Sequence, residues 1–256
     1  MSAVINGMSL TKVRPFGATF FVFTDYMRGG MRLSALMEIP VIYILTHDSL
    51  GVGEDGPTHQ PIEHLAIARA TPGLLTLRPA DANEVAEAWK VVMQLQHQPA
   101  LLVLTRQALP TVDRTKYASA SGIARGAYVL AENAGARPDV LLIATGSEVS
   151  LCIDAFEQLS KEGINARVVS MPSWELFDRQ DQAYRDSVLP PAVKARVSVE
   201  MAAAFGWERY VGTSGRIIGM HSFGASAPIK ALQKHFGFTT ENVVAAAKEQ
   251  IQSAKN

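Results

Sequence analysis

Apolar runs and amphipathic stretches alternate along most of the chain. Unbroken apolar runs predict buried strands, and residues that recur at intervals of three and four predict helices. The predicted strands are 41–45, 74–77, 100–105, 127–130, 140–145, 166–171, 197–200 and 217–218. The predicted helices are 62–70, 81–96, 146–162, 228–235 and 242–250. This alternation indicates an α/β fold of two three-layer units with mainly parallel sheets and crossover helices.

The N-terminal region gives weaker signals. Phe20, Phe23 and Tyr26 recur at helical spacing, so residues 18–37 are predicted as one helix that Gly29 and Gly30 weaken. Residues 1–16 contain the turn signal Asn6-Gly7 and predict no element at which a domain would start.

A polar stretch without periodicity, residues 110–121, separates the two α/β units. It is typical of an interdomain linker. The predicted domains are therefore residues 1–116 and 117–256 of the 256-residue chain.

Composition and charge exclude several function classes. The 24 basic and 24 acidic side chains balance, so the chain has no basic footprint for nucleic acid. No segment approaches the roughly 20 apolar residues that cross a bilayer, and no signal peptide is evident, so a cytoplasmic location is expected. Cys152 is the only cysteine, which rules out an internal disulfide; its place in an amphipathic helix predicts a packing role.

The glycine-rich loop at residues 46–61 concentrates polar chemistry directly after a predicted strand. It contains the imidazoles of His47 and His59 and the carboxylates of Asp48, Glu54 and Asp55. Ligands in α/β proteins bind at the carboxyl ends of parallel strands, and imidazoles exchange protons near neutral pH. The alternatives are an ordinary polar surface loop and a metal site, although the spacing fits no known ligand template.

Other candidates allow two interpretations each. Arg106 ends a predicted strand, where a guanidinium could bind a phosphate or lie on the surface in solvent. Phe20, Phe23 and Tyr26 could belong to a core or wall a pocket for a flat heterocycle. The turn 145–147 favours a hydroxyl N-cap over a nucleophile, and the pattern assigns Glu200 and His221 no chemistry.

The loop THDSLGVGEDGPTHQP resembles the hallmark loop of transketolases. The resemblance continues through TFFVFTDYMR, RPADANEV, LTRQALP, ATGSEVSL, ARVVSMPSWELFD, SVLPPAV and HFGFTTENV. Transketolases use thiamine diphosphate to move two-carbon ketol units between sugar phosphates, in the pentose phosphate pathway and the Calvin cycle. The intact GEDGPTHQP with LTRQ downstream favours them over other thiamine-diphosphate enzymes, such as deoxyxylulose-phosphate synthases and dehydrogenase E1 components.

The resemblance implies roles for individual residues. Phe20, Phe23 and Tyr26 match the aromatic wall around the cofactor's aminopyrimidine. His47 and His59 match catalytic imidazoles that contact substrate hydroxyls and the reacting carbonyl, Asp55 the acid that reads the C2 hydroxyl, and Arg106 the arginine that binds the terminal phosphate. The resemblance also implies a homodimer for the complete enzyme, with an active site between subunits.

The chain also departs from the family pattern. Nothing in it corresponds to the domain that binds the diphosphate and Mg²⁺, and Met1 matches the end of a GxREFGM-like segment that carries the activating glutamate. The expectation is therefore a transketolase fragment, inactive alone, whose first unit is truncated at its N-terminus and prone to self-association. The alternatives are one half of a split transketolase and a non-catalytic binding or regulatory remnant.

Overall fold

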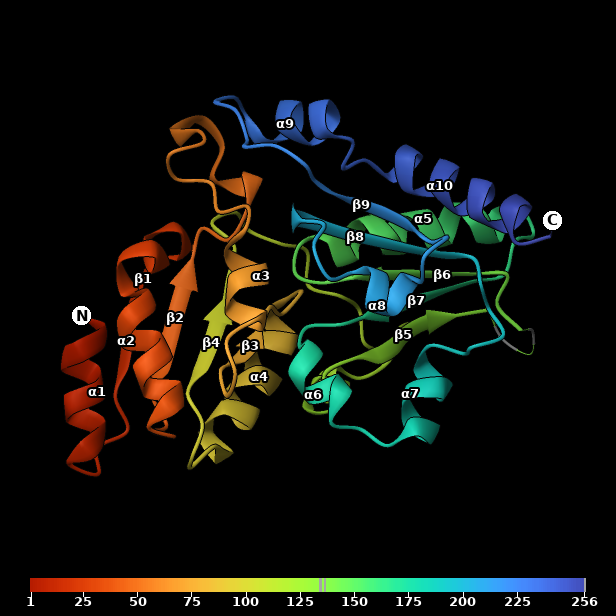
Figure 1. Cartoon of the computed structure of the whole chain (residues 1–256). Coiled ribbons are helices and arrows are strands. Elements are labelled where there is room, and N and C mark those ends of the chain that lie inside the picture. The colour runs from red at the N-terminus through yellow and green to blue at the C-terminus, as the bar shows by residue number, and fades with distance from the viewer. Residues whose placement is uncertain (134, 136, 256) are drawn as a thin grey trace.

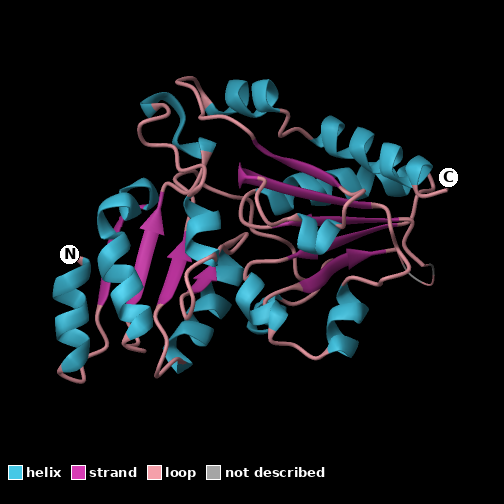
Figure 2. Ribbon diagram, in the orientation of Figure 1, coloured by secondary structure: helices cyan, strands magenta, loops and turns pink. Residues whose placement is uncertain are grey.

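The computed structural model describes residues 1–133, 135 and 137–255. Two sheets with helices on both faces lie beside each other, the first unit red to yellow and the second green to blue in Figure 1. The strands run in parallel with one exception, as Figure 2 shows by secondary structure. The predicted α/β fold with mainly parallel sheets is confirmed.

The first sheet has four parallel strands in the order β1-β2-β4-β3. The strands are β1 (Phe16–Phe20), β2 (Ile42–Thr46), β3 (Leu75–Leu77) and β4 (Ala100–Val103). The α-helices are α1 (Ser2–Leu10), α2 (Thr24–Leu36), α3 (His64–Arg69) and α4 (Ala82–Gln94). Strand β2 carries no charged side chain from Ile42 to Leu45 because alternate side chains enter different cores, Tyr43 and Leu45 on one face and Ile42 on the other.

The single helix predicted over residues 18–37 is wrong at its start. Phe20 ends β1, Phe21–Phe23 forms a 3-10 turn, and α2 begins at Thr24. Strand β1 pairs in parallel with β2, from Phe16 opposite Ile42 to Phe20 opposite Thr46. This pairing with a distant segment overrides the local helical spacing of the aromatic residues.

Residues 1–16, in which no element was predicted, contain α1 and the start of β1. Asn6, which suggested a turn, donates to the Gly30 carbonyl at 2.8 Å and accepts from the Tyr43 hydroxyl at 3.0 Å. A Cβ built on Gly30 would lie 2.3 Å from Ser2 Oγ, so glycine allows α1 to approach α2. The glycine that weakens α2 locally is thus required for helix packing.

The second sheet has five strands in the order β5-β7-β6-β8-β9, with only β5 antiparallel among the described strands. The strands are β5 (Tyr128–Glu132), β6 (Val140–Ala144), β7 (Ala166–Ser170), β8 (Arg196–Ala203) and β9 (Arg216–Met220). The helices are α5 (Glu148–Lys161), α6 (Trp174–Asp178), α7 (Gln182–Val188), α8 (Glu208–Val211), α9 (Ile229–Phe236) and α10 (Thr240–Ser253).

Helices α5 and α10 share one apolar core with the second sheet, and α6, α7 and α8 share another. Cys152 lies fully buried in α5, which agrees with its predicted packing role. Burial raises the pKa of its thiol.

The segment between β4 and β5 connects the two units, through the 3-10 turn η3 (Ala120–Arg125). The division at 116/117 stays a prediction. Asp81, the first residue of the predicted helix 81–96, caps α4 by accepting a hydrogen bond from the Glu84 amide at 2.8 Å. Glu84 also accepts hydrogen bonds from Tyr128 and Ser170 of the second unit, so this helix start holds the units together.

Candidate functional site

Phe20 and His47 meet at the carboxyl edge of the first sheet. Phe20 is the last residue of β1 and pairs with Thr46, the last residue of β2, so His47 follows beside it. The two rings stack with centroids 3.6 Å apart and an interplanar angle of 21°. His47 has a φ of +63°, a left-handed conformation that a non-glycine residue rarely adopts.

Further rings continue from this pair. Phe20 and Phe23 are parallel within 6° with centroids 6.1 Å apart, and Phe23 contacts His59 edge-on at 5.8 Å. Tyr26 lies 6.3 Å from Phe23 and is 87% exposed, so it belongs to no core. The structure therefore brings together the three aromatic residues and both histidines that the sequence singled out.

The charges of Arg106, Asp55 and Asp48, the remaining candidates, act on the pKa of His47. Burial and the positive charge of Arg106 lower the pKa of His47, while the carboxylates of Asp55 and Asp48 oppose this shift. Arg106 and Asp55 are exposed, Arg106 just beyond β4 and Asp55 at the end of the 3-10 turn η2 (Leu50–Asp55). Both charges are thus close enough to His47 to affect its protonation.

A buried cation fixes the start of the loop. Arg78 is fully buried after β3, and its Nε donates to Asp48 at 2.8 Å. Its Nη1 donates to the Thr145 hydroxyl at 2.8 Å and to Glu148, both in the second unit. Asp48 is only 2% exposed, so Arg78 binds a buried carboxylate of the loop at 46–61 and the other unit at the same time.

A second ion pair continues this network. Both Arg69 Nη atoms donate to Glu200 at 2.8 Å, and Trp207 Nε1 donates to the same carboxylate at 2.9 Å. Burial opposes ionisation, yet Arg69, Arg78 and the Thr145 hydroxyl together lower the pKa of Glu200 to about 2. The sequence pattern assigned Glu200 no role, but its carboxylate accepts hydrogen bonds from the side chains of Arg69, Thr145 and Trp207. The Thr145 hydroxyl belongs to this network, and Ser147 makes no capping hydrogen bond.

The second unit also holds the middle of the loop. Gln60 Nε2 donates to the carbonyls of Gly53 and Ala225, each at 3.0 Å, and the Ser226 hydroxyl donates to the Glu54 carbonyl. Gly56 has a φ of +79°, and a Cβ there would lie 3.2 Å from the Ser226 side chain. The conformation of residues 46–61 therefore depends on both units.

Sequence reasoning missed Arg78, Glu148 and Gln60. The available signal was Arg78 itself, a charged residue directly after the apolar segment Leu74–Leu77. Partners that are 30 and 70 residues away give no local pattern.

Metal-binding clusters and membrane-spanning helices are both absent from residues 1–133, 135 and 137–255. No group of three or more His, Cys, Asp or Glu side chains there could hold a metal ion. No described helix is long and apolar enough to cross a membrane.

Comparisons with known proteins give family matches over both units. The family model of the transketolase pyrimidine-binding domain matches residues 1–112, and that of the transketolase-like C-terminal domain matches residues 126–239. The chain is 53% identical to transketolase of Geobacillus stearothermophilus over 97% of its own length and 37% of that protein. It is 54% identical to chloroplastic transketolase of Solanum tuberosum over 97% of its length and 34% of that protein.

Solved structures of transketolases are also similar to this chain. Transketolase from Leishmania mexicana superposes with a TM-score of 0.93 at 43% identity, covering 100% of this chain and 37% of that one. A split-gene transketolase, described as an inactive beta4 tetramer, gives 0.81 at 26% identity, covering 98% of this chain and 80% of that one. The chain thus spans little more than a third of the curated relatives it matches. It belongs to the transketolase family, a family of thiamine-diphosphate-dependent transferases, and corresponds to its pyrimidine-binding and C-terminal parts.

Proposed function

We propose that this chain provides the sugar-phosphate-binding side of a transketolase active site. The reaction is transfer of a two-carbon ketol unit from a ketose phosphate to an aldose phosphate. The observation that carries the proposal is the stack of His47 on Phe20 at the carboxyl edge of β1 and β2, with Asp55, His59 and Arg106 around it. Ligands of parallel α/β sheets bind at this edge.

The aromatic side chains fit the pyrimidine end of thiamine diphosphate. Phe23 and Tyr26 extend outward from the Phe20–His47 stack, and the large exposure of Tyr26 leaves ring surface free for a flat heterocycle. When bound, the cofactor supplies the carbanion and the electron sink for C–C cleavage. The diphosphate and Mg²⁺ would be held by the part of the family that this chain does not match.

The polar residues have distinct parts in substrate binding. The lowered pKa of His47 keeps its imidazole neutral near pH 7, so it can accept a proton from a substrate hydroxyl. His59 contacts the reacting carbonyl and Asp55 accepts a hydrogen bond from the C2 hydroxyl. Arg106, exposed at the rim, binds the terminal phosphate. Together they fix the sugar in a reactive position.

The proposal also includes how the complete enzyme assembles and where it is located. We expect the complete active site to lie between two subunits of a homodimer. The cytoplasmic location stays a prediction, since the relatives include both bacterial and chloroplastic transketolases.

A chimera tests the function directly. The matching part of Geobacillus stearothermophilus transketolase is replaced by this chain, and turnover of xylulose 5-phosphate with ribose 5-phosphate is measured with thiamine diphosphate and Mg²⁺. We expect an active chimera that loses most of its kcat with His47→Ala, whereas Arg106→Gln mainly raises KM. A folded, cofactor-loaded chimera without turnover would disprove the proposed function.

The chain alone gives a second test. We expect no turnover from it under the same conditions. The similarity to the split-gene transketolase, of which the chain covers 80%, favours one alternative: half of a two-chain enzyme. Purification together with a second protein that restores turnover would support that alternative.

A further inference from the structure

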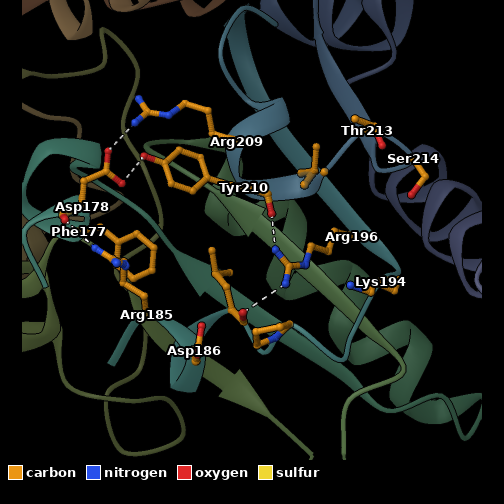
Figure 3. A pocket seen from close by; sticks show the side chains of 14 residues that line it. Phe177, Asp178, Arg185, Asp186, Lys194, Arg196, Arg209, Tyr210, Thr213 and Ser214 are labelled. Atoms are coloured by element: carbon orange, nitrogen blue, oxygen red, sulfur yellow. Dashed lines mark hydrogen bonds and ion pairs between the residues drawn. The ribbon is translucent and has the colours of Figure 1, made fainter. Parts of the chain in front are cut away.

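A pocket unrelated to the loop at 46–61 lies on the second unit. It has a volume of about 630 Å³ and lies at the amino ends of β8 and β9, bounded by α6, α7, α8 and the turn at residues 212–214 (Figure 3). This size is in the usual range for small-molecule sites. The lining includes none of the site residues that the sequence predicted.

Basic side chains outnumber acidic ones in this pocket. Arg185, Lys194, Arg196 and Arg209 line it, against Asp178 and Asp186. Asp178 is already bound, by Arg209 at 3.0 Å and by the Tyr210 hydroxyl at 3.0 Å. Within the described part of the chain, Arg185, Lys194 and Arg196 form no ion pair with a carboxylate.

Arg196 is a fixed positive charge in the pocket wall. Its guanidinium donates to the carbonyls of Val193 at 3.0 Å, Tyr210 at 2.6 Å and Pro190 at 2.9 Å, as Figure 3 shows in part. These carbonyl dipoles orient the guanidinium but leave its net charge in place. Burial lowers the pKa of Arg196, and the carboxylate of Asp186 opposes this shift only in part, so a bound anion would further stabilise the charged form.

The other donors have free capacity. Arg185 uses one Nη for the Asp178 and Gln180 carbonyls and the other for Gln182, which leaves its Nε unused in the described structure. Lys194 is exposed, and Thr213 and Ser214, which carry hydroxyls, line the same pocket (Figure 3). An ammonium, a guanidinium and two hydroxyls can together surround one anion.

We propose that this pocket binds a phosphate-bearing small molecule. A phosphate carries up to two negative charges and several acceptor oxygens, and so satisfies these donors better than a carboxylate does. The space is much larger than one phosphate, and Leu189, Tyr210 and Val211 in the lining offer surface to the carbon part of the ligand. The site is separate from the proposed transferase function, so either can fail without the other.

Nuclear magnetic resonance of the intact chain tests the proposal, with glucose 6-phosphate as the probe. We expect saturable shifts of the amides at residues 212–215, with none from glucose or from sodium chloride at equal ionic strength. Lys194→Gln should weaken binding at least about fivefold, the loss of one charged hydrogen bond. Lys230→Gln, which changes an exposed lysine on α9, should leave it unchanged.

A last comparison separates this pocket from the proposed substrate site. Arg106→Gln should leave the shifts at residues 212–215 unaltered, because Arg106 lies in the first unit. Shifts that grow without saturation, or equal affinities of the Lys194→Gln and Lys230→Gln variants, would overturn the proposal.

Discussion

Arg78 Nε lies 2.8 Å from Asp48 Oδ2, and both side chains are almost completely buried. The same guanidinium contacts Glu148 of the second unit, so one cation balances two carboxylates from different parts of the fold. Removing two charges from water costs several kcal/mol each, which their mutual attraction must offset. The loop that starts at His47 is therefore anchored by an interaction that fails if either unit is displaced.

Arg78→Met tests this anchor. Asp48 and Glu148 would remain buried without a counter-charge, so we expect the free energy of unfolding to fall by about 3–5 kcal/mol. Urea denaturation measures it, and limited proteolysis should show faster cleavage within residues 46–61.

Arg216→Met provides the matched control, since Arg216 is exposed at the start of β9 and its side chain makes no hydrogen bond or ion pair in the described structure. The free energy of unfolding of the Arg216→Met variant should differ from that of the wild type by less than about 0.5 kcal/mol. Equal losses for the two variants would show that Arg78 does not anchor the loop.

Gly146→Ala should disturb the same interaction from the other side. A Cβ at Gly146 would lie 2.6 Å from Arg78 Cζ, and the buried guanidinium has no room to move. Gly163→Ala is the control: its φ of +76° carries a similar backbone penalty of about 1–2 kcal/mol, but no atom lies within 4 Å of the added Cβ. We expect Gly146→Ala to cost clearly more in urea denaturation; equal costs would contradict the close packing around Arg78.

Elements with strong local signals were predictable from the sequence. The apolar runs that became β2, β6 and β7 and the Asp81 cap of α4 depend on residues that are close in sequence. The polar loop after β2 was identifiable because strand ends and glycines mark it. The predictions failed for segments whose structure depends on distant partners. Strand β1 forms by pairing with β2, and helix α1 packs against Gly30 of α2.

The same distinction applies to the site. His47, His59 and Asp55 were found because they lie together in one loop. Glu200 was assigned no chemistry because its partner Arg69 lies 131 residues away, and nothing near either residue in sequence indicates an ion pair. The role of a buried charged side chain can be recognised only when its partner in the folded structure is known.

Glu200 gives stability a defined dependence on pH. Its pKa is about 2 in the folded protein, below its ordinary value of 4.5, so the unfolded chain binds the proton more tightly. Its contribution is therefore complete above about pH 4.5 and is lost as the pH falls toward 2. The shift corresponds to about 3 kcal/mol.

Comparison with Glu200→Gln isolates this effect. The pKa values of Glu84 and Glu148 are raised, mainly by burial, so these residues make the opposite contribution in acid. The wild type should lose its stability advantage over Glu200→Gln between pH 4.5 and 2, as measured by urea denaturation at each pH. A difference independent of pH would contradict the assignment.

The charges around His47 make opposite predictions for two variants. Arg106→Gln removes a positive charge and should raise the pKa of His47, whereas Asp55→Asn removes a negative charge and should lower it further. Proton magnetic resonance of the His47 ring across pH measures both shifts; shifts of the same sign would mean that these residues do not surround His47.

Exposed apolar side chains on α1 and the edge strand β1 predict self-association of the chain. Val4, Leu10 and Phe16 are 66%, 60% and 63% exposed, and β1 has a strand partner on only one side. An unpaired edge with apolar neighbours favours pairing between chains, and a lysine on an edge strand opposes it. Sedimentation equilibrium should therefore show concentration-dependent association that Phe16→Lys reduces. Phe223→Ser, which alters an equally exposed residue outside this edge, should not reduce it. A wild-type chain that is monomeric at every concentration would show that this apolar edge does not drive association.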